Sequence, residues 1–213
     1  MKKTKYIIAL LVAAISFALP AQAQERILTA IGATGKTELK VANDIKNLYF
    51  ANKPESKTFK ITTNTTVKPR ASADWFQASI NGNVVTVSVV ENSDADLRSG
   101  ELTLAAPDGQ SKIINVTQLG TNPGFFVSTD TARVKGIDAG VVVNITSNAN
   151  LTFTGSEWIT PKDATPVVGT KNYVFIAGKM QQGTRTGTLN VSDGTNSKSV
   201  VVEQNFEGFP TFI

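Results

Sequence analysis

The chain has 213 residues, with 21 Lys and Arg, 17 Asp and Glu, no Cys and no His. The lack of cysteine excludes disulfides and thiolate metal sites, and the lack of histidine excludes imidazole acid–base catalysis and Ser-His nucleophilic pairs. Residues 1–23 contain three of the basic side chains and none of the acidic ones, so the remainder has a net charge of +1. That charge does not predict a nucleic-acid partner.

Residues 1–23 are predicted to form a secretory signal peptide. Three lysines precede an apolar run over 6–19, and Ala21-Gln22-Ala23 has the small-x-small pattern of a cleavage site. The run is too short for a typical membrane-spanning helix, and no cysteine follows the cleavage site to carry a lipid. We therefore expect cleavage after Ala23 and an exported chain with no membrane span, located in the periplasm, on the cell surface or outside the cell.

The mature chain is predicted to be all-β. Residues 24–36 form an N-terminal segment, and beyond it the apolar runs last four to seven residues between turn-forming residues. No segment keeps a 3.6-residue apolar period over three turns, whereas Val, Thr and aromatic residues alternate as they do in half-buried strands. Short strands at this spacing are typical of a sandwich or barrel.

Two units of about 85 residues repeat one pattern, over 37–121 and 122–206. Each unit contains an alternating run that ends in Asn, then a Trp, an Arg and a Gln: Asn64, Trp75, Arg98 and Gln118 in the first, and Asn148, Trp158, Arg185 and Gln204 in the second. The length of each unit is close to that of an immunoglobulin-type domain. The predicted architecture is therefore two tandem immunoglobulin-like β-sandwich domains, joined with limited freedom by the short, turn-rich connection 119–124.

Each unit ends in a predicted β-hairpin. Residues 98–118 and 185–204 both begin Arg-x-Gly, turn at Asp-Gly and end on Gln. Asp-Gly between alternating runs is a strong hairpin signal, because Gly accepts the positive φ that a tight turn needs. Alternation then places four apolar side chains of each hairpin on one buried face: Leu102, Leu104, Ile114 and Val116 in the first, and Leu189, Val191, Val200 and Val202 in the second.

These residues carry a resemblance to a known family. The order apolar-x-Val and Leu-x-Phe, then (Phe/Val)-x-Ile-Thr-(Thr/Ser)-Asn, Trp, Arg-x-Gly and Ile/Val-x-Val-x-Gln resembles the BACON domain (Bacteroidetes-associated carbohydrate-binding often N-terminal). The resemblance covers two tandem copies, from about Thr37 to Gly120 and from Pro123 to Phe206. It implies an immunoglobulin-like sandwich in an exported bacterial protein, with a carbohydrate-binding role for some members and a spacer role for others.

The repeated Trp and Gln residues have both structural and functional interpretations. Trp75 and Trp158 could stack on a sugar ring, but a Trp at a fixed place in each copy favours a core position. Gln118 and Gln204 are in phase with buried Val and Ile, so we expect buried amides that bind backbone groups.

The repeated Arg and Asn residues favour local structural roles. Arg98 and Arg185 could bind a ligand carboxylate, although their place before a Gly and a strand favours a tie between a loop and the backbone. Asn64 and Asn148 follow strand ends and are predicted to form turns through side-chain-to-backbone hydrogen bonds.

Comparison of the two copies gives one candidate ligand-binding surface, made of Tyr173 and Phe175. Counting back from Arg-x-Gly without a gap aligns Tyr173 with Thr86 and Phe175 with Ser88, which alternate with apolar Val residues and so face solvent. This register predicts two outward rings that could form a platform for neighbouring sugars. A one-residue slip would exchange the faces, and both faces of 173–176 are apolar, so burial in the core or in a domain interface remains an alternative.

No catalytic residues, cofactor or metal site are expected, and the chain is predicted not to be an enzyme. One function class is an exported module that binds polysaccharide or glycoprotein glycans. The alternative is a structural spacer or an adhesion module that contacts proteins. The apolar tail 207–213 contains Phe209 and Phe212. It could contact a protein partner or fold back over the second sandwich.

Overall fold

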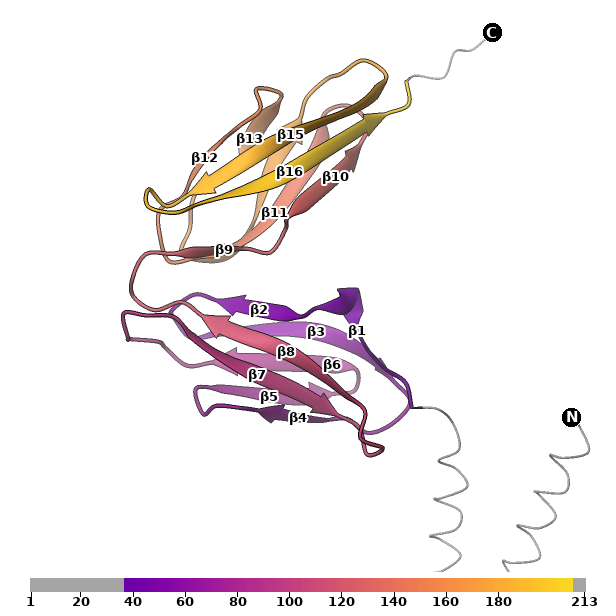
Figure 1. Cartoon of the computed structure of the whole chain (residues 1–213), viewed down its shortest axis with the longest axis vertical. Helices are drawn as coiled ribbons and strands as arrows, with labels where there is room; N and C mark the ends of the chain where they lie inside the picture. The colour runs from indigo at the N-terminus through magenta and orange to yellow at the C-terminus, as the bar shows by residue number, and fades with distance from the viewer. Residues whose placement is uncertain (1–36, 209–213) are drawn as a thin grey trace, which may run out of the picture. The chain divides into compact units, whose positions relative to one another are not determined.

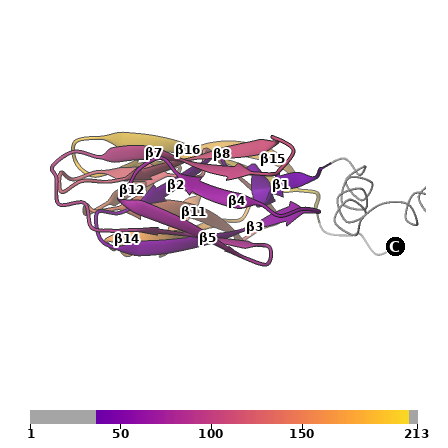
Figure 2. The same cartoon turned by 90° about the horizontal axis from the view of Figure 1, so that it is seen from below.

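The computed structural model describes residues 37–208 as two β-sandwiches (Figure 1). The predicted signal peptide, the segment 24–36 and residues 209–213 of the tail lie outside the described residues. The first sandwich has one sheet in the order β1-β3-β6-β5 and another in the order β2-β8-β7-β4, and Figure 2 shows β7 and β8 in a layer above β3 and β5. Its strands are β1 (Leu39–Val41), β2 (Asn47–Phe50), β3 (Glu55–Thr63), β4 (Lys68–Ala71), β5 (Phe76–Asn81), β6 (Val84–Val89), β7 (Arg98–Ala105) and β8 (Ser111–Gln118).

The second sandwich repeats this topology strand for strand. Its sheets have the orders β13-β14-β11-β9 and β10-β16-β15-β12. In both sandwiches the second strand of the copy pairs with the last strand in parallel, and the other pairings are antiparallel. The strands are β9 (Phe125–Val127), β10 (Thr131–Lys135), β11 (Ala139–Ser147), β12 (Thr152–Gly155), β13 (Ile159–Asp163), β14 (Gly169–Ala177), β15 (Gly183–Ser192) and β16 (Ser197–Phe206).

The all-β prediction is confirmed for the described residues, whose one helical segment is the 3-10 turn η1 (Ala42–Asp44). The eight hairpin residues predicted to face inward are all buried, seven of them completely. In each sandwich they pack in a core with apolar side chains of the opposite sheet, including Val85 and Val87 in the first and Val141 and Val143 in the second. Period-2 patterning therefore determines which face of each strand is buried.

The two Asp-Gly hairpins form as predicted. Gly109 and Gly194 take φ values of 90° and 92° between the paired strands. In the second turn the Asp193 carboxylate accepts hydrogen bonds from the backbone N–H groups of Thr195 (2.9 Å) and Asn196 (2.7 Å). Burial alone would raise the pKa of the Asp193 carboxyl, but the hydrogen bonds from Asn196 and Thr195 outweigh it and hold the pKa below its ordinary value.

The connection 119–124 is held by hydrogen bonds along its length. The backbone N–H of Thr121 donates to the Asp94 carbonyl (2.7 Å) in the loop that precedes β7. The Asn148 Nδ2 donates to the carbonyls of Gly120 (2.6 Å) and Asn122 (2.8 Å). Asn148 thus makes the side-chain-to-backbone bonds predicted for it, but with the connection rather than within its own turn.

Candidate ligand-binding groove

The repeated Trp, Arg and Gln of the first copy form one structural cluster. Gln118 is fully buried, and its Oε1 accepts from Arg98 Nε (2.9 Å) and Nη2 (2.7 Å) while its Nε2 donates to the Val90 carbonyl (2.9 Å). The Arg98 guanidinium lies 4.7 Å from the centre of the half-buried Trp75 ring, which packs against the core. Burial lowers the pKa of Arg98 despite the nearby Asp94, and Arg98 remains a cation at neutral pH.

The second copy builds the same cluster. Arg185 Nε donates to Gln204 Oε1 (2.9 Å), and its guanidinium lies 4.1 Å from the centre of the Trp158 ring. The Gly of Arg-x-Gly makes room for this ring, because a Cβ on Gly187 would lie 2.6 Å from Trp158 Cζ2. The structural interpretations of the Gln and Arg residues are confirmed. The Trp rings are half-buried and pack against the core rather than within it, with an Arg guanidinium over one side of each ring.

Tyr173 and Phe175 do not form an exposed platform, so that prediction is wrong. Both side chains are 1% exposed in the core of the second sandwich. Phe153 packs against both rings, with ring centres 5.0 Å from Tyr173 and 5.3 Å from Phe175. The Tyr173 hydroxyl accepts a hydrogen bond from the backbone N–H of Val167 (3.1 Å).

A one-residue deletion explains the error in register. The carbonyls that accept from Arg98 and Arg185 belong to Val90 and Gly178, eight and seven residues earlier in the chain. The second copy is therefore one residue shorter between β14 and β15, and ungapped counting shifts every earlier position by one. The correct equivalents of Tyr173 and Phe175 are the buried Val85 and Val87.

A shallow groove on the outer face of the β2-β8-β7-β4 sheet is the best candidate site in the first sandwich. Its volume is about 400 Å³. Strands β2, β8 and β7 lie side by side there, so their outward side chains come together from distant parts of the sequence. We call this site the outer groove, and its lining residues are Asn47, Tyr49, Ser99, Gly100, Glu101, Asn115 and Thr117.

The outer groove is rich in groups that can bind hydroxyls. Asn115 Nδ2 donates to Asn47 Oδ1 across the parallel β2–β8 pair (3.1 Å), and the Ser99 and Thr117 hydroxyls are hydrogen-bonded across β7–β8 (3.2 Å). These pairs fix the orientation of the amides and hydroxyls, and each group keeps further donor or acceptor capacity. Arrays of amide, hydroxyl and carboxylate groups can bind hydroxylated ligands.

Tyr49 and Glu101 complete the lining at the two ends of this array. The Tyr49 ring is half-buried and stacks on Phe126, with ring centres 4.4 Å apart, which fixes its position beside the outer groove. The Glu101 side chain is exposed on β7, directly opposite Asn115 in the β7–β8 register. Glu101 is the one charged residue among those that line the outer groove.

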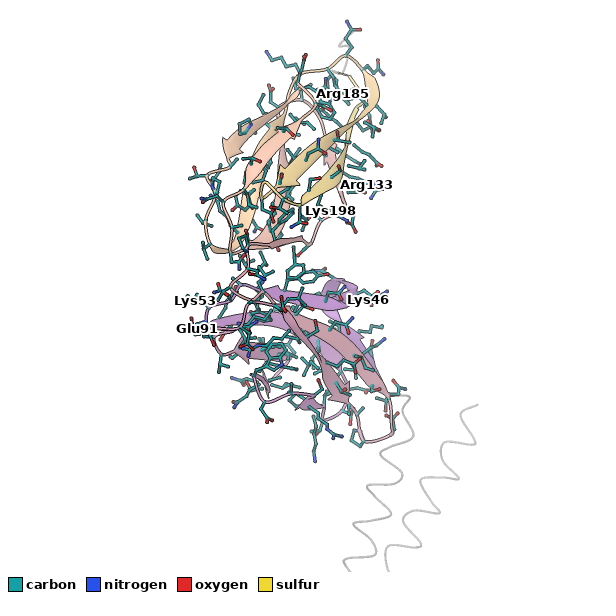
Figure 3. The ribbon with its side chains drawn as sticks, turned by 60° about the vertical axis from the view of Figure 1, so that its left-hand side comes forward. Lys46, Lys53, Glu91, Arg133, Arg185 and Lys198 are labelled. Atoms are coloured by element: carbon teal, nitrogen blue, oxygen red, sulfur yellow. The ribbon has the colours of Figure 1, made fainter. Side chains whose placement is uncertain are left out.

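The equivalent face of the second sandwich has different chemistry. Aligning the two copies on Gln118 and Gln204 places Arg133 at the position of Tyr49 and Glu203 at that of Thr117. Arg133 Nε and Glu203 Oε2 form an ion pair at 2.8 Å on this face, and Arg133 is labelled in Figure 3. The second sandwich therefore presents a paired cation and anion on this face. At the same two positions the first sandwich presents the Tyr49 ring and the Thr117 hydroxyl.

Sequence reasoning missed the outer groove because each of its residues fits a solvated strand face. Asn115 and Thr117 alternate with buried Ile114 and Val116, as expected for polar side chains that only face water. The signal that could have revealed it is a comparison of the outward-facing residues of the two copies, and this comparison requires the strand register that the structure shows.

A larger hollow of about 670 Å³ lies at the connection 119–124, and loop residues form most of its lining. The hydrogen bonds that hold the connection lie in the same region.

The described residues show two further features relevant to function. Within 37–208 no three His, Cys, Asp or Glu side chains are grouped so that they could hold a metal ion. In the same part of the chain no helix has the length and apolar character needed to cross a membrane.

A family comparison matches part of the first sandwich. Residues 71–119 match the model of the BACON family, described as "Putative binding domain, N-terminal". The matched region includes β5 to β8 and the outer-groove residues on β7 and β8. The match does not extend to the second copy, so it supports the predicted resemblance for one copy rather than two. No curated protein shows significant similarity to the chain.

Solved structures show similarity at low identity. The Bacteroides ovatus GH5 xyloglucanase in complex with a XXXG heptasaccharide matches at 27% identity with a TM-score of 0.36, covering 38% of this chain and 19% of that chain. Domains 5-6 of the S-layer protein SbsC match at 13% identity with a TM-score of 0.43, covering 81% of this chain and 100% of that one. An endo-fucoidan hydrolase of glycoside hydrolase family 107 matches at 14% identity and 0.34, covering 83% of this chain and 30% of that one. The chain thus spans about a fifth of the xyloglucanase chain.

Proposed function

We propose that the chain is an exported, non-catalytic module that binds polysaccharide or glycoprotein glycans through the outer groove. The observation that carries this proposal is the convergence of amide, hydroxyl and carboxylate groups from three strands on one exposed face. That face lies in the sandwich whose residues match a binding-domain family. Sugars present closely spaced hydroxyls, each able to donate and accept a hydrogen bond, and the groups of the outer groove complement them.

The proposal is tested by a glycan array followed by binding measurements on paired variants. Glu101→Ala with Asn115→Ala removes two groups of the outer groove that lie opposite one another. Each ligand hydrogen bond is worth about 1 kcal/mol, so we expect at least a tenfold loss of affinity. Both side chains are exposed, and the melting temperature of the variant should stay close to that of the unchanged chain.

The second sandwich supplies the matched control. Thr188→Ala with Val201→Ala changes the equivalent positions there and should leave glycan affinity unchanged. Equal losses from both pairs of substitutions would show that binding does not depend on the outer groove. Absence of binding across plant, host and microbial glycans would refute the proposal.

A structural spacer is the second candidate function, and a specific observation favours it. The residues that both copies share, Trp, Arg-x-Gly and Gln, are bonded to one another and to backbone groups. The shared pattern therefore maintains the sandwich. Two results together would fit this function. The unchanged chain would bind no glycan, and substitutions in the outer groove would leave its melting temperature unchanged.

A further inference from the structure

We infer that the outer groove selects neutral glycans over anionic ones, and that Glu101 provides the selection. The inference rests on the proposed function, since it specifies the class of glycan that the same site accepts. Among the seven residues that line the outer groove, Glu101 alone carries a charge, and the others offer amides, hydroxyls, an aromatic ring and backbone.

The position of Glu101 makes it a direct contact for any ligand in the outer groove. It lies on β7 between Ser99 and Thr103, opposite Asn115 of β8, with its side chain exposed. A carboxylate accepts hydrogen bonds at both oxygens and donates none. Adjacent hydroxyls of a neutral sugar can donate to it together, whereas the carboxylate of a uronate or the sulfate of a sulfate ester cannot donate and repels it as a like charge.

Basic side chains occur near the outer groove, but none of them lines it. Arg70 on β4 pairs with Thr103, one step beyond Glu101 along the sheet, and it does not line the outer groove. Lys46 precedes β2 and lies 3.4 Å from the Asp44 carboxylate, with which it forms an exposed ion pair. The charge that faces a ligand within the outer groove is therefore the negative charge of Glu101.

The test compares neutral glycans with carboxymethylated glycans of the same backbone. The full chain is immobilised, and biolayer interferometry measures binding of dextran against carboxymethyl dextran, and of hydroxyethylcellulose against carboxymethylcellulose. Interactions between exposed charges are weak, so we expect neutral members to bind about threefold to fivefold more tightly at low salt. Glu101→Gln keeps the size and acceptor oxygen of the side chain, and it should remove this preference while retaining binding of the neutral member.

A charge control separates the effect of the outer groove from that of net charge. Glu157→Gln removes one exposed carboxylate from the second sandwich and should leave the preference intact. Tighter binding of the carboxymethylated members by the unchanged chain, or a preference that survives Glu101→Gln, would overturn the inference while glycan binding itself stands. No binding of either neutral polymer, together with no binding on the glycan array, would instead refute the proposed function and, with it, the inference.

Discussion

Replacing Gln204 by Leu should destabilise the second sandwich through one buried amide. Gln204 Nε2 lies 2.7 Å from the carbonyl oxygen of Gly136 and 3.0 Å from that of Gly178, and Oε1 accepts from Arg185 Nε at 2.9 Å. The side chain is fully buried. One amide thus joins the loop between β10 and β11, the end of β14 and the start of β15.

The expected cost follows from the groups that lose their partner. Leu cannot donate to the Gly136 carbonyl or accept from Arg185. Each of these two polar groups left without its bond costs about 1–3 kcal/mol, or about 4 kcal/mol for the two together. Burial of the larger, apolar Leu side chain offsets this cost by about 1–2 kcal/mol of unfolding free energy. The net loss should be about 3 kcal/mol, a large share of the 5–15 kcal/mol that stabilises a typical domain.

Urea denaturation followed by tryptophan fluorescence measures this loss in the second sandwich alone. The chain has one Trp in each sandwich, so a Trp75→Phe background leaves Trp158 as the reporter. With a slope of about 1.5 kcal/mol per molar urea, Gln204→Leu should lower the midpoint by about 2 M. The control Glu203→Leu alters the preceding, outward residue and should shift the midpoint by less than about 0.5 M. An equally small shift for Gln204→Leu at unchanged slope would refute the reasoning.

Three further substitutions test other parts of the fold. Gly187→Ala should lower stability by about 1–3 kcal/mol in thermal melts, because its Cβ would lie 2.6 Å from a carbon of the Trp158 ring. Gly120→Ala should do the same in the first sandwich, where the new Cβ would lie 2.3 Å from a backbone oxygen. Asp193 has a lowered pKa in the folded chain, so its contribution to stability is present above the unfolded pKa and disappears as pH falls through the folded one. Asp193→Asn should therefore weaken the acid dependence of the melting temperature below about pH 4, and an unchanged dependence would contradict this role.

Sequence patterning predicted the strands and their buried faces because alternation and turn chemistry are local properties. The Asp-Gly turns and the apolar residues that alternate in both hairpins needed no knowledge of distant contacts. Tyr173 and Phe175 were placed on the wrong face because their register depended on the length of the loop before Arg185. A single missing residue there reverses the face of every residue in β14, and the apolar character of 173–176 on both faces gave no correction.

The outer groove could not be predicted for a related reason. It forms because β2 pairs in parallel with β8, which brings Asn47 beside Asn115 across 68 positions of sequence. Parallel strands are not joined by a tight turn, so no turn residues in the sequence indicate that β2 and β8 pair. Outward Asn, Thr and Glu side chains also occur on any solvated strand, so the composition of this face did not distinguish a site from ordinary surface.

The internal repeat separates residues that maintain the fold from residues free to acquire function. Both copies keep the Trp, the Arg and the Gln, and the structure accounts for each through contacts within its own sandwich. At equivalent outward positions the copies differ, with Tyr49 and Thr117 in the first and the ion pair of Arg133 and Glu203 in the second. An exposed ion pair contributes little to stability, so folding does not require either arrangement. Experiments on function should therefore begin with the outward positions at which the two copies disagree.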